Sequence, residues 1–212
     1  MSGAQRLVPW LTLALLTVVG AGGAALGIMA SNAPVALDTA ATSTLHAANY
    51  TELATVTGGE DGNETLSLVW HAPDTLGGHV ESQGRRAYVW VFGTTEYQST
   101  TVAVTRGPSG LTIQKGTGQP ASASDPAQGL LPYAQRATHV TRSGDTYSFE
   151  VTQDGQTAHF TATVTGPYVS RITVSAPSQS SVLGISQVGT SPPVKLPAGA
   201  KIVAAAPSSA AG

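Results

Sequence analysis

Cysteine is absent from the 212-residue chain, and this absence removes several classes of protein. No disulfide framework, zinc–thiolate site or cysteine nucleophile can form. A bacterial lipid anchor is also excluded, because it is attached to a cysteine at the signal cleavage site. Charged residues are scarce as well, at 10% of the chain. The polar surface must therefore be built mainly from Thr, Ser, Gln and Gly.

The chain also lacks a basic excess and has only one long apolar run. The single run argues against a polytopic membrane protein. A hydrophobic content of 41% and a net charge of -2 argue against disorder of the whole chain. Nucleic-acid binding needs clustered Lys and Arg, whereas the one basic doublet is Arg85-Arg86. We expect this doublet to be solvent-facing charge in a strand, and we expect no nucleic-acid partner.

The apolar run extends from Leu7 to Ala30 without a charged residue. At about 1.5 Å per residue, a helix of this length spans roughly 36 Å, enough to cross the hydrocarbon core of a bilayer. Arg6 supplies the positive flank that stays in the cytoplasm, so everything after the run is expected outside. Leu7 to Val19 also fits the core of a cleaved signal peptide, although no clear cleavage site follows. An uncleaved anchor and a cleaved peptide both stay open.

Composition divides the chain into three parts. We expect residues 1–34 to form the anchor or signal peptide and residues 35–203 to form one folded domain. The tail 204–212, rich in Ala, Ser and Pro, is expected to be disordered. At the start of the domain, Val35 to Ala48 carries apolar residues at helical spacing and predicts a short helix.

A second helix is predicted at Ala127 to Ala137. Asp125 is the expected N-cap and Pro126 the first helical residue. The internal Pro132 should make this helix short or kinked. Before it, the segment from Gly107 to Pro126 is rich in Gly, Ser, Pro and Ala, and we interpret it as a loop.

A period-two alternation of apolar and polar residues starts at Tyr50 and predicts an antiparallel, mainly β domain. We interpret pairs such as Gly77-Gly78 and Asp154-Gly155 as turns between the strands. Arg85 to Phe92 is apolar at both alternations, so this strand is expected to be covered on both faces. The predicted strands are residues 64–71, 85–92, 96–105, 146–152, 156–165 and 168–174.

No pattern of catalytic or metal-binding residues appears. The five histidines show no metal-ligand spacing with an acidic residue between them. There is no Gly-x-Ser-x-Gly elbow and no Walker or Rossmann glycine pattern. We therefore expect no catalytic residue, no metal and no cofactor, and a protein that is not an enzyme.

Several short passages together resemble the LolA-like superfamily of lipoprotein-sorting domains, in its actinobacterial LppX and LprG type. They cover most of the chain after the apolar run and mark turns and strand ends rather than chemistry. The passages are Asn49-Tyr50-Thr51, Trp70-His71-Ala72-Pro73-Asp74, Val89 to Gly93 with Tyr97, Asp125 to Gly144, and Ser191 to Pro197.

The resemblance implies a strongly curved antiparallel half-barrel with short helices on its concave face, preceded here by one N-terminal membrane or signal helix. It also implies that acyl chains or lipidated proteins are held between sheet and helices. This chain departs from the lipoprotein members because it lacks their anchoring cysteine. The same apolar residues are also compatible with an ordinary core. The candidate cavity lining is Leu66, Leu68, Trp70, Tyr88, Trp90, Phe92 and Phe149.

The leading hypothesis is a non-enzymatic, membrane-tethered or exported cell-envelope protein that binds a lipid or another hydrophobic ligand. Its membrane partner would be reached through Leu7 to Ala30. The alternative is an extracytoplasmic protein-interaction or envelope-stress sensor module. Because only six residues precede the apolar run, such a sensor would have to act through a partner protein.

Overall fold

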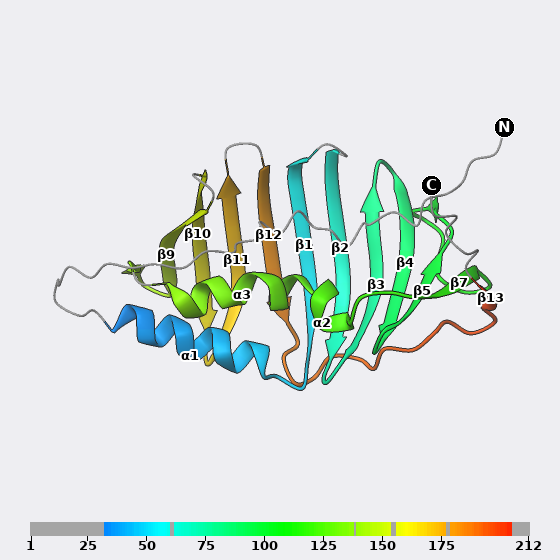
Figure 1. Ribbon diagram of the computed structural model, residues 1–212, viewed down its shortest axis with the longest axis horizontal. Helices are drawn as coiled ribbons and strands as arrows, with labels where there is room; N and C mark the ends of the chain where they lie inside the picture. The colour runs from blue at the N-terminus through cyan, green and yellow to red at the C-terminus, as the bar shows by residue number, and fades with distance from the viewer. Residues whose placement is uncertain (1–31, 60–61, 138, 154–155, 177–178, 205–212) are drawn as a thin grey trace, which may run out of the picture.

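The computed structural model describes residues 32–59, 62–137, 139–153, 156–176 and 179–204, which form one large sheet with three helices (Figure 1). The predicted membrane segment Leu7 to Ala30 lies outside these residues, as does the tail after Ala204. Within the described part of the chain, no helix is long and apolar enough to cross a membrane.

Thirteen strands build the sheet, in the order β13-β7-β5-β4-β3-β2-β1-β12-β11-β10-β9-β8, with β6 paired to β4. All pairs are antiparallel except β13 with β7, so the sheet is mixed. The strands are β1 (Asn49–Gly59), β2 (Gly62–His71), β3 (Thr75–Ser82), β4 (Arg85–Phe92), β5 (Thr95–Ser99), β6 (Val102–Ala103), β7 (Thr112–Thr117), β8 (Thr141–Ser143), β9 (Thr146–Gln153), β10 (Gln156–Thr165), β11 (Tyr168–Ala176), β12 (Gln179–Ser186) and β13 (Lys201–Ala204).

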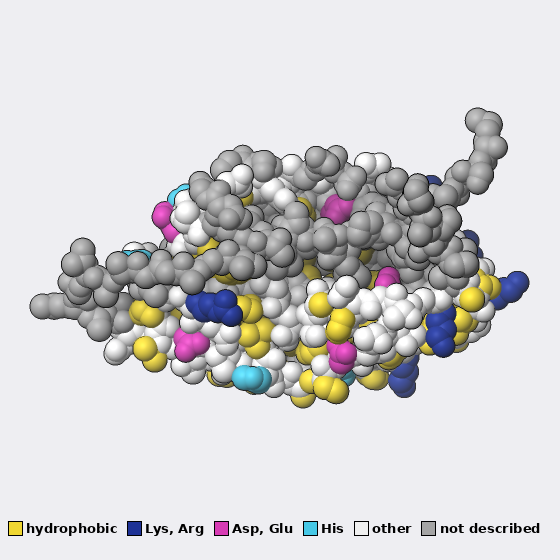
Figure 2. All heavy atoms as spheres, viewed as in Figure 1, with side chains coloured by type: hydrophobic (Ala, Val, Ile, Leu, Met, Phe, Trp, Pro, Cys, Tyr) yellow, Lys and Arg dark blue, Asp and Glu magenta, His cyan; other side chains and the backbone are white. Residues whose placement is uncertain are grey.

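The helices α1 (Ala33–Leu45), α2 (Ala121–Ser124) and α3 (Pro126–Arg136) lie on one side of the sheet, which we call the inner face (Figure 1). Thr44 fixes α1 to this face, because its hydroxyl accepts a hydrogen bond from the Val169 N–H at 2.9 Å. Gln135 Nε2 of α3 donates to Thr42 Oγ1 of α1 at 2.9 Å and joins the two helices. Figure 2 shows few charged side chains on the side viewed, in keeping with the composition, and most of the visible Lys and Arg lie toward the right-hand end.

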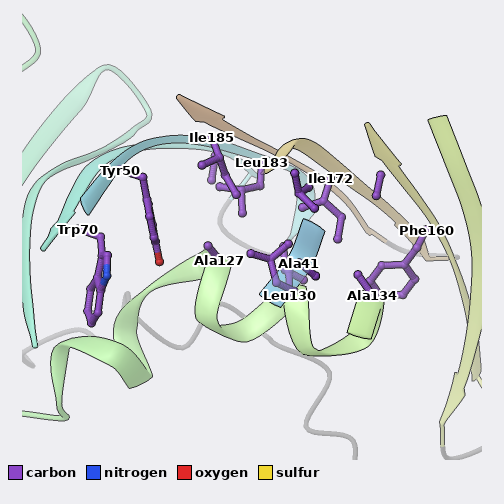
Figure 3. Packing of buried hydrophobic residues seen from close by; sticks show 14 of the residues in the cluster. Ala41, Tyr50, Trp70, Ala127, Leu130, Ala134, Phe160, Ile172, Leu183 and Ile185 are labelled. Carbon is purple, nitrogen blue, oxygen red and sulfur yellow. The ribbon is translucent and has the colours of Figure 1, made fainter. Parts of the chain in front are cut away.

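The main core lies between the helices and the inner face. Leu37 and Ala41 of α1 and Leu131 of α3 are fully buried against sheet residues such as Leu68 and Ile172. Figure 3 shows side chains from α3 and from the strands pointing toward one another. Each fully buried Leu or Ile stabilises the fold by about 1.5–3 kcal/mol, so this contact holds the helices in place.

A smaller cluster lies on the opposite, outer face. Tyr88 and Trp90 of β4 stack with their ring centroids 5.9 Å apart and pack with Leu111 and Ile113. The segment after β12 covers them through side chains that include Val194. Strand β4 is therefore buried on both faces, which confirms the prediction for Arg85 to Phe92.

Both predicted helices are confirmed. Asp125 caps α3, with its Oδ1 accepting hydrogen bonds from Ala127 N at 2.8 Å and Gln128 N at 3.4 Å. The helix continues past Pro132 to Arg136, so the proline does not end it.

Three local predictions were wrong. Gly77-Gly78 is no turn but lies inside β3, between two strands that approach closely. The supposed loop from Gly107 to Pro126 contains β7 and α2, because β7 pairs with β5 and β13 far away in sequence. The predicted strand 96–105 is broken at residues 100–101, after which β6 pairs with the start of β4.

Candidate ligand-binding site

The structure divides the seven predicted lining residues between the two faces of the sheet. Four of them belong to the inner-face core: Leu66, Leu68, Trp70 and Phe149. The other three belong to the outer-face cluster or pack against it: Tyr88, Trp90 and Phe92. One site cannot use both groups, since the sheet lies between them. The sequence alone could not assign the β4 residues to one face of the sheet, because β4 has apolar residues at both its odd and its even positions.

A buried polar cluster sits on the inner face where β1 meets the start of α3. The Tyr50 hydroxyl donates a hydrogen bond to Asp125 Oδ2 at 2.6 Å and accepts one from Gln128 Nε2 at 3.2 Å. The Ala127 N–H lies 2.9 Å from Glu52 Oε1 and 2.8 Å from Asp125 Oδ1. The exposed fractions of Glu52 and Asp125 are only 1% and 2%. Two carboxyl groups therefore hold the first turn of α3 against the sheet.

Burial determines the charge of this cluster. It raises the pKa of Glu52 well above its usual range, and the neighbouring Asp125 carboxylate raises it further. Burial also raises the pKa of Asp125, although its hydrogen bonds from Tyr50 and from the α3 backbone act in the opposite sense. Asp125 accepts more hydrogen bonds than Glu52 and caps a helix N-terminus, which favours its charged form. We therefore expect the pair to hold one shared proton, mainly on Glu52.

Three enclosed polar atoms have no hydrogen-bond partner among the described residues: Glu52 Oε2, Trp70 Nε1 and Ser82 Oγ. Burial favours the protonated form of Glu52, which lowers the cost of leaving its Oε2 without a partner. Trp70 stacks on Tyr50 with centroids 6.2 Å apart, and both rings project from the sheet toward the helices (Figure 3). Its indole N–H thus faces the apolar interior, where only an added acceptor would satisfy it.

A cavity of about 210 Å³ opens on the inner face at the β3–β4 hairpin, beyond α2. Val80 and Ala87 lie opposite each other and provide its apolar wall, and Leu66 is paired with Val80 on the next strand. Ser82 and Arg85 form the next pair toward the hairpin. The Arg85 guanidinium donates to the Thr101 carbonyl at 3.1 Å, so its charge stays at the rim. The cavity therefore has an apolar floor that continues into the core and a cationic mouth.

No protein-family model matches the sequence, and no curated protein sequence matches it either. The chain is similar to several solved structures, among them two mycobacterial proteins. LprF from Mycobacterium bovis matches with a TM-score of 0.50 and 10% identity over 82% of this chain and 99% of its own. The lipoprotein LppX of Mycobacterium tuberculosis matches with a TM-score of 0.50 and 14% identity over 77% of this chain and 97% of its own. The chain has the LppX/LprG-like fold.

This match confirms the resemblance that the sequence passages indicate, at the level of the fold. In this LppX-like domain the helices cover the centre of the inner face, and the 210 Å³ cavity lies at their margin. Among the described residues, no group of three or more acidic or histidine side chains is placed to hold a metal ion.

Sequence reasoning missed Glu52 as a member of the LppX-like core. A signal was present, because Glu52 stands at an inward position of the alternation Tyr50, Glu52, Ala54, Val56. A carboxyl group at a core position indicates a buried partner. That partner, Asp125, lies 73 residues away in sequence (125 − 52), and only the folded chain brings the two together.

Proposed function

We propose that the chain is a non-enzymatic cell-envelope protein, tethered through Leu7 to Ala30 or exported, that binds a lipid or another hydrophobic ligand on the inner face. The LppX/LprG-like fold supports this location and this kind of ligand. The strong curvature implied by the resemblance is part of the proposal. A sheet that bends away from its helices leaves apolar space beside them, and burial of ligand surface there gives about 25 cal/mol per Å².

The observation that carries the proposal is the cavity at the β3–β4 hairpin. Its wall of Val80 and Ala87 continues through Leu66 into the main core, so an alkyl chain entering there stays in apolar surroundings. Arg85 at the mouth is suited to a polar or anionic end of the same ligand. We place the ligand's tail toward Leu66, Leu68 and Trp70, with Phe149 at the far end of the same face.

Filling the cavity should block the ligand. Ala87→Leu adds apolar volume at the wall of the 210 Å³ space, and we expect at least a fivefold loss of lipid retained by the purified full chain. Organic extraction and mass spectrometry measure the retained lipid, and displacement of a fluorescent fatty acid measures affinity. Ala198→Leu is the matched control, because Ala198 is exposed in the segment after β12, which lies on the outer face.

The proposal fails if the wild-type chain retains no lipid and binds no fluorescent fatty acid. It also fails if Ala87→Leu and Ala198→Leu retain equal amounts. A thermal melt of each variant separates loss of the cavity from loss of the fold.

A further inference from the structure

A second cavity lies at the other end of the molecule, under the first half of α1. Its volume of about 460 Å³ is within the range of small-ligand sites, roughly 300–1,000 Å³. None of the seven predicted lining residues borders it. Its wall is formed by Ala36, Thr39 and Ala40 of α1, Arg142 and Asp145 of the β8–β9 hairpin, Tyr147 of β9, and Val164, Thr165, Gly166 and Pro167 at the β10–β11 turn.

Arg142 supplies a cation to this cavity. Its guanidinium carbon lies 5.2 Å from the centre of the Tyr147 ring, and its Nε donates to the Gly144 carbonyl at 2.8 Å. These two contacts fix the plane of the guanidinium. Within the described residues no carboxylate forms an ion pair with it. Arg142 is exposed, and its terminal nitrogens stay available to an oxyanion, which a guanidinium can bind with two parallel hydrogen bonds.

Tyr147 is the second observation that indicates a ligand. Its exposed fraction is only 3%, and no hydrogen bond to its hydroxyl occurs in the part of the chain that the structure describes. The hydroxyl is not one of the enclosed polar atoms without a partner, so it is accessible from the cavity that Tyr147 lines. Because Tyr147 lines the cavity beneath Arg142, an oxyanion held by Arg142 would lie within reach of this hydroxyl.

The cavity also contains a negative charge and an apolar wall. Asp145 would repel a purely anionic ligand but would attract an ammonium group next to the oxyanion. Ala36, Ala40 and Val164 offer contact to methylene groups. The arrangement of one cation, one hydroxyl and one carboxylate is complementary to a zwitterion rather than to a simple anion.

Helix α1, which borders the cavity, follows the predicted membrane segment closely, and this points to the membrane as the source of such a zwitterion. α1 begins at Ala33, three residues after Ala30, where the predicted membrane segment ends. Three residues reach at most about 11 Å, so the first turns of α1 would stay near the headgroups of a bilayer. Val35 in the first turn of α1 is 67% exposed, the largest value among the exposed large hydrophobic side chains. An apolar side chain at that place is suited to contact with the membrane interface.

We infer that the α1–β8–β9 cavity binds the headgroup of a zwitterionic phospholipid of the membrane to which the chain is tethered. The phosphate contacts Arg142 and Tyr147, and the ammonium contacts Asp145. This inference rests on the tethered form of the proposed function, but it uses a different cavity from the one proposed for the hydrophobic ligand. It gives the domain a fixed position on the bilayer surface.

The test uses the full chain in an uncharged detergent and soluble glycerophosphoethanolamine as the probe, with ³¹P line broadening as the readout. We expect saturable binding that Arg142→Gln weakens roughly tenfold or more, because a charge-assisted bidentate contact is lost. Tyr147→Phe keeps the ring and should weaken binding a few-fold. Arg171→Gln is the matched control, since Arg171 is exposed on β11 away from the cavity, and it should change nothing.

Two further probes identify the ligand class. Glycerophosphoglycerol and inorganic phosphate should bind more weakly than glycerophosphoethanolamine, and Asp145→Asn should abolish this preference. The inference is overturned if the wild type shows no saturable binding, if Arg142→Gln binds as well as Arg171→Gln, or if inorganic phosphate binds as tightly as glycerophosphoethanolamine. If Ala87→Leu loses fatty-acid binding while its ³¹P broadening stays unchanged, the two cavities bind their ligands independently. Failure of one proposal can then be distinguished from failure of the other.

Discussion

Replacement of Gly78 by alanine should destabilise the fold by about 3 kcal/mol or more. A Cβ atom at this position would overlap the carbonyl oxygen of Ser67 and lie 2.9 Å from Leu68 Cα. Both obstacles are backbone atoms of β2, so they can move only if the pairing of β2 with β3 is disturbed. For a domain of this size the melting temperature should fall by roughly 6–12 °C, as measured by circular dichroism.

Gly184→Ala is the control for this change. Gly184 is also a glycine inside a strand, but a Cβ atom there would lie 3.7 Å from the Leu53 carbonyl oxygen, an ordinary contact. Its melting temperature should stay close to that of the wild type. Equal stability of the two variants would show that β2 and β3 do not approach as closely as described. The result bears on function as well, because β3 carries Val80 at the wall of the ligand cavity.

The second large effect concerns pH and the buried pair of Glu52 and Asp125. Because folding raises the pKa of both groups, the folded state binds protons more tightly than the unfolded chain. The stabilisation is complete below the unfolded pKa of about 4.3 and is lost as the pH rises toward the folded pKa of Glu52. Within that window the free energy of unfolding should fall by about 1.4 kcal/mol per pH unit for each proton released.

Glu52→Gln should remove most of this pH dependence. The amide oxygen can still accept from Ala127 N, and the amide N–H₂ can donate to Asp125 in place of the shared proton. We therefore expect the variant to be more stable than the wild type at alkaline pH and similar to it at acidic pH. Urea unfolding at a series of pH values measures the difference.

Asp38→Asn is the comparison variant, since Asp38 is exposed on α1 and should leave the slope of the wild type in place. A wild-type stability that is constant from acidic to alkaline pH would contradict the shared proton. Because the pair binds the first turn of α3 to β1, loss of the proton should also loosen that helix. Faster hydrogen exchange of α3 amides at alkaline pH, absent in Glu52→Gln, would show this loosening directly.

The predictions from the sequence were correct for elements that are decided by neighbouring residues along the chain. Helix α1 follows from the spacing of small apolar residues, and the start of α3 follows from Asp125 and Pro126, which act within one turn. The alternation at residues 64–71 and 156–165 identified β2 and β10 for the same reason. Short-range backbone preferences decide such elements before any tertiary contact forms.

The wrong predictions concern segments whose structure is set by contacts with residues far away in sequence. Gly77-Gly78 has the composition of a turn, yet the approach of β2 requires Gly78 inside a strand. Strand β7 exists because β5 and β13 pair with it, although its own residues have the composition of a loop. The sequence of β4 allowed two orientations, and only its pairing with β3 placed Val89 inward and Trp90 outward.

By itself, the sequence determined a mainly β domain with short helices, because composition and periodicity are properties of the chain read in order. Export through the segment from Leu7 to Ala30 stays a prediction. The tertiary structure alone decided which residues meet. It joined Glu52 to Asp125, separated Trp70 from Trp90, and placed Arg142 over Tyr147 beneath α1. These relations depend on strand order and register, which follow from the balance of burial over the whole sheet rather than from any short segment.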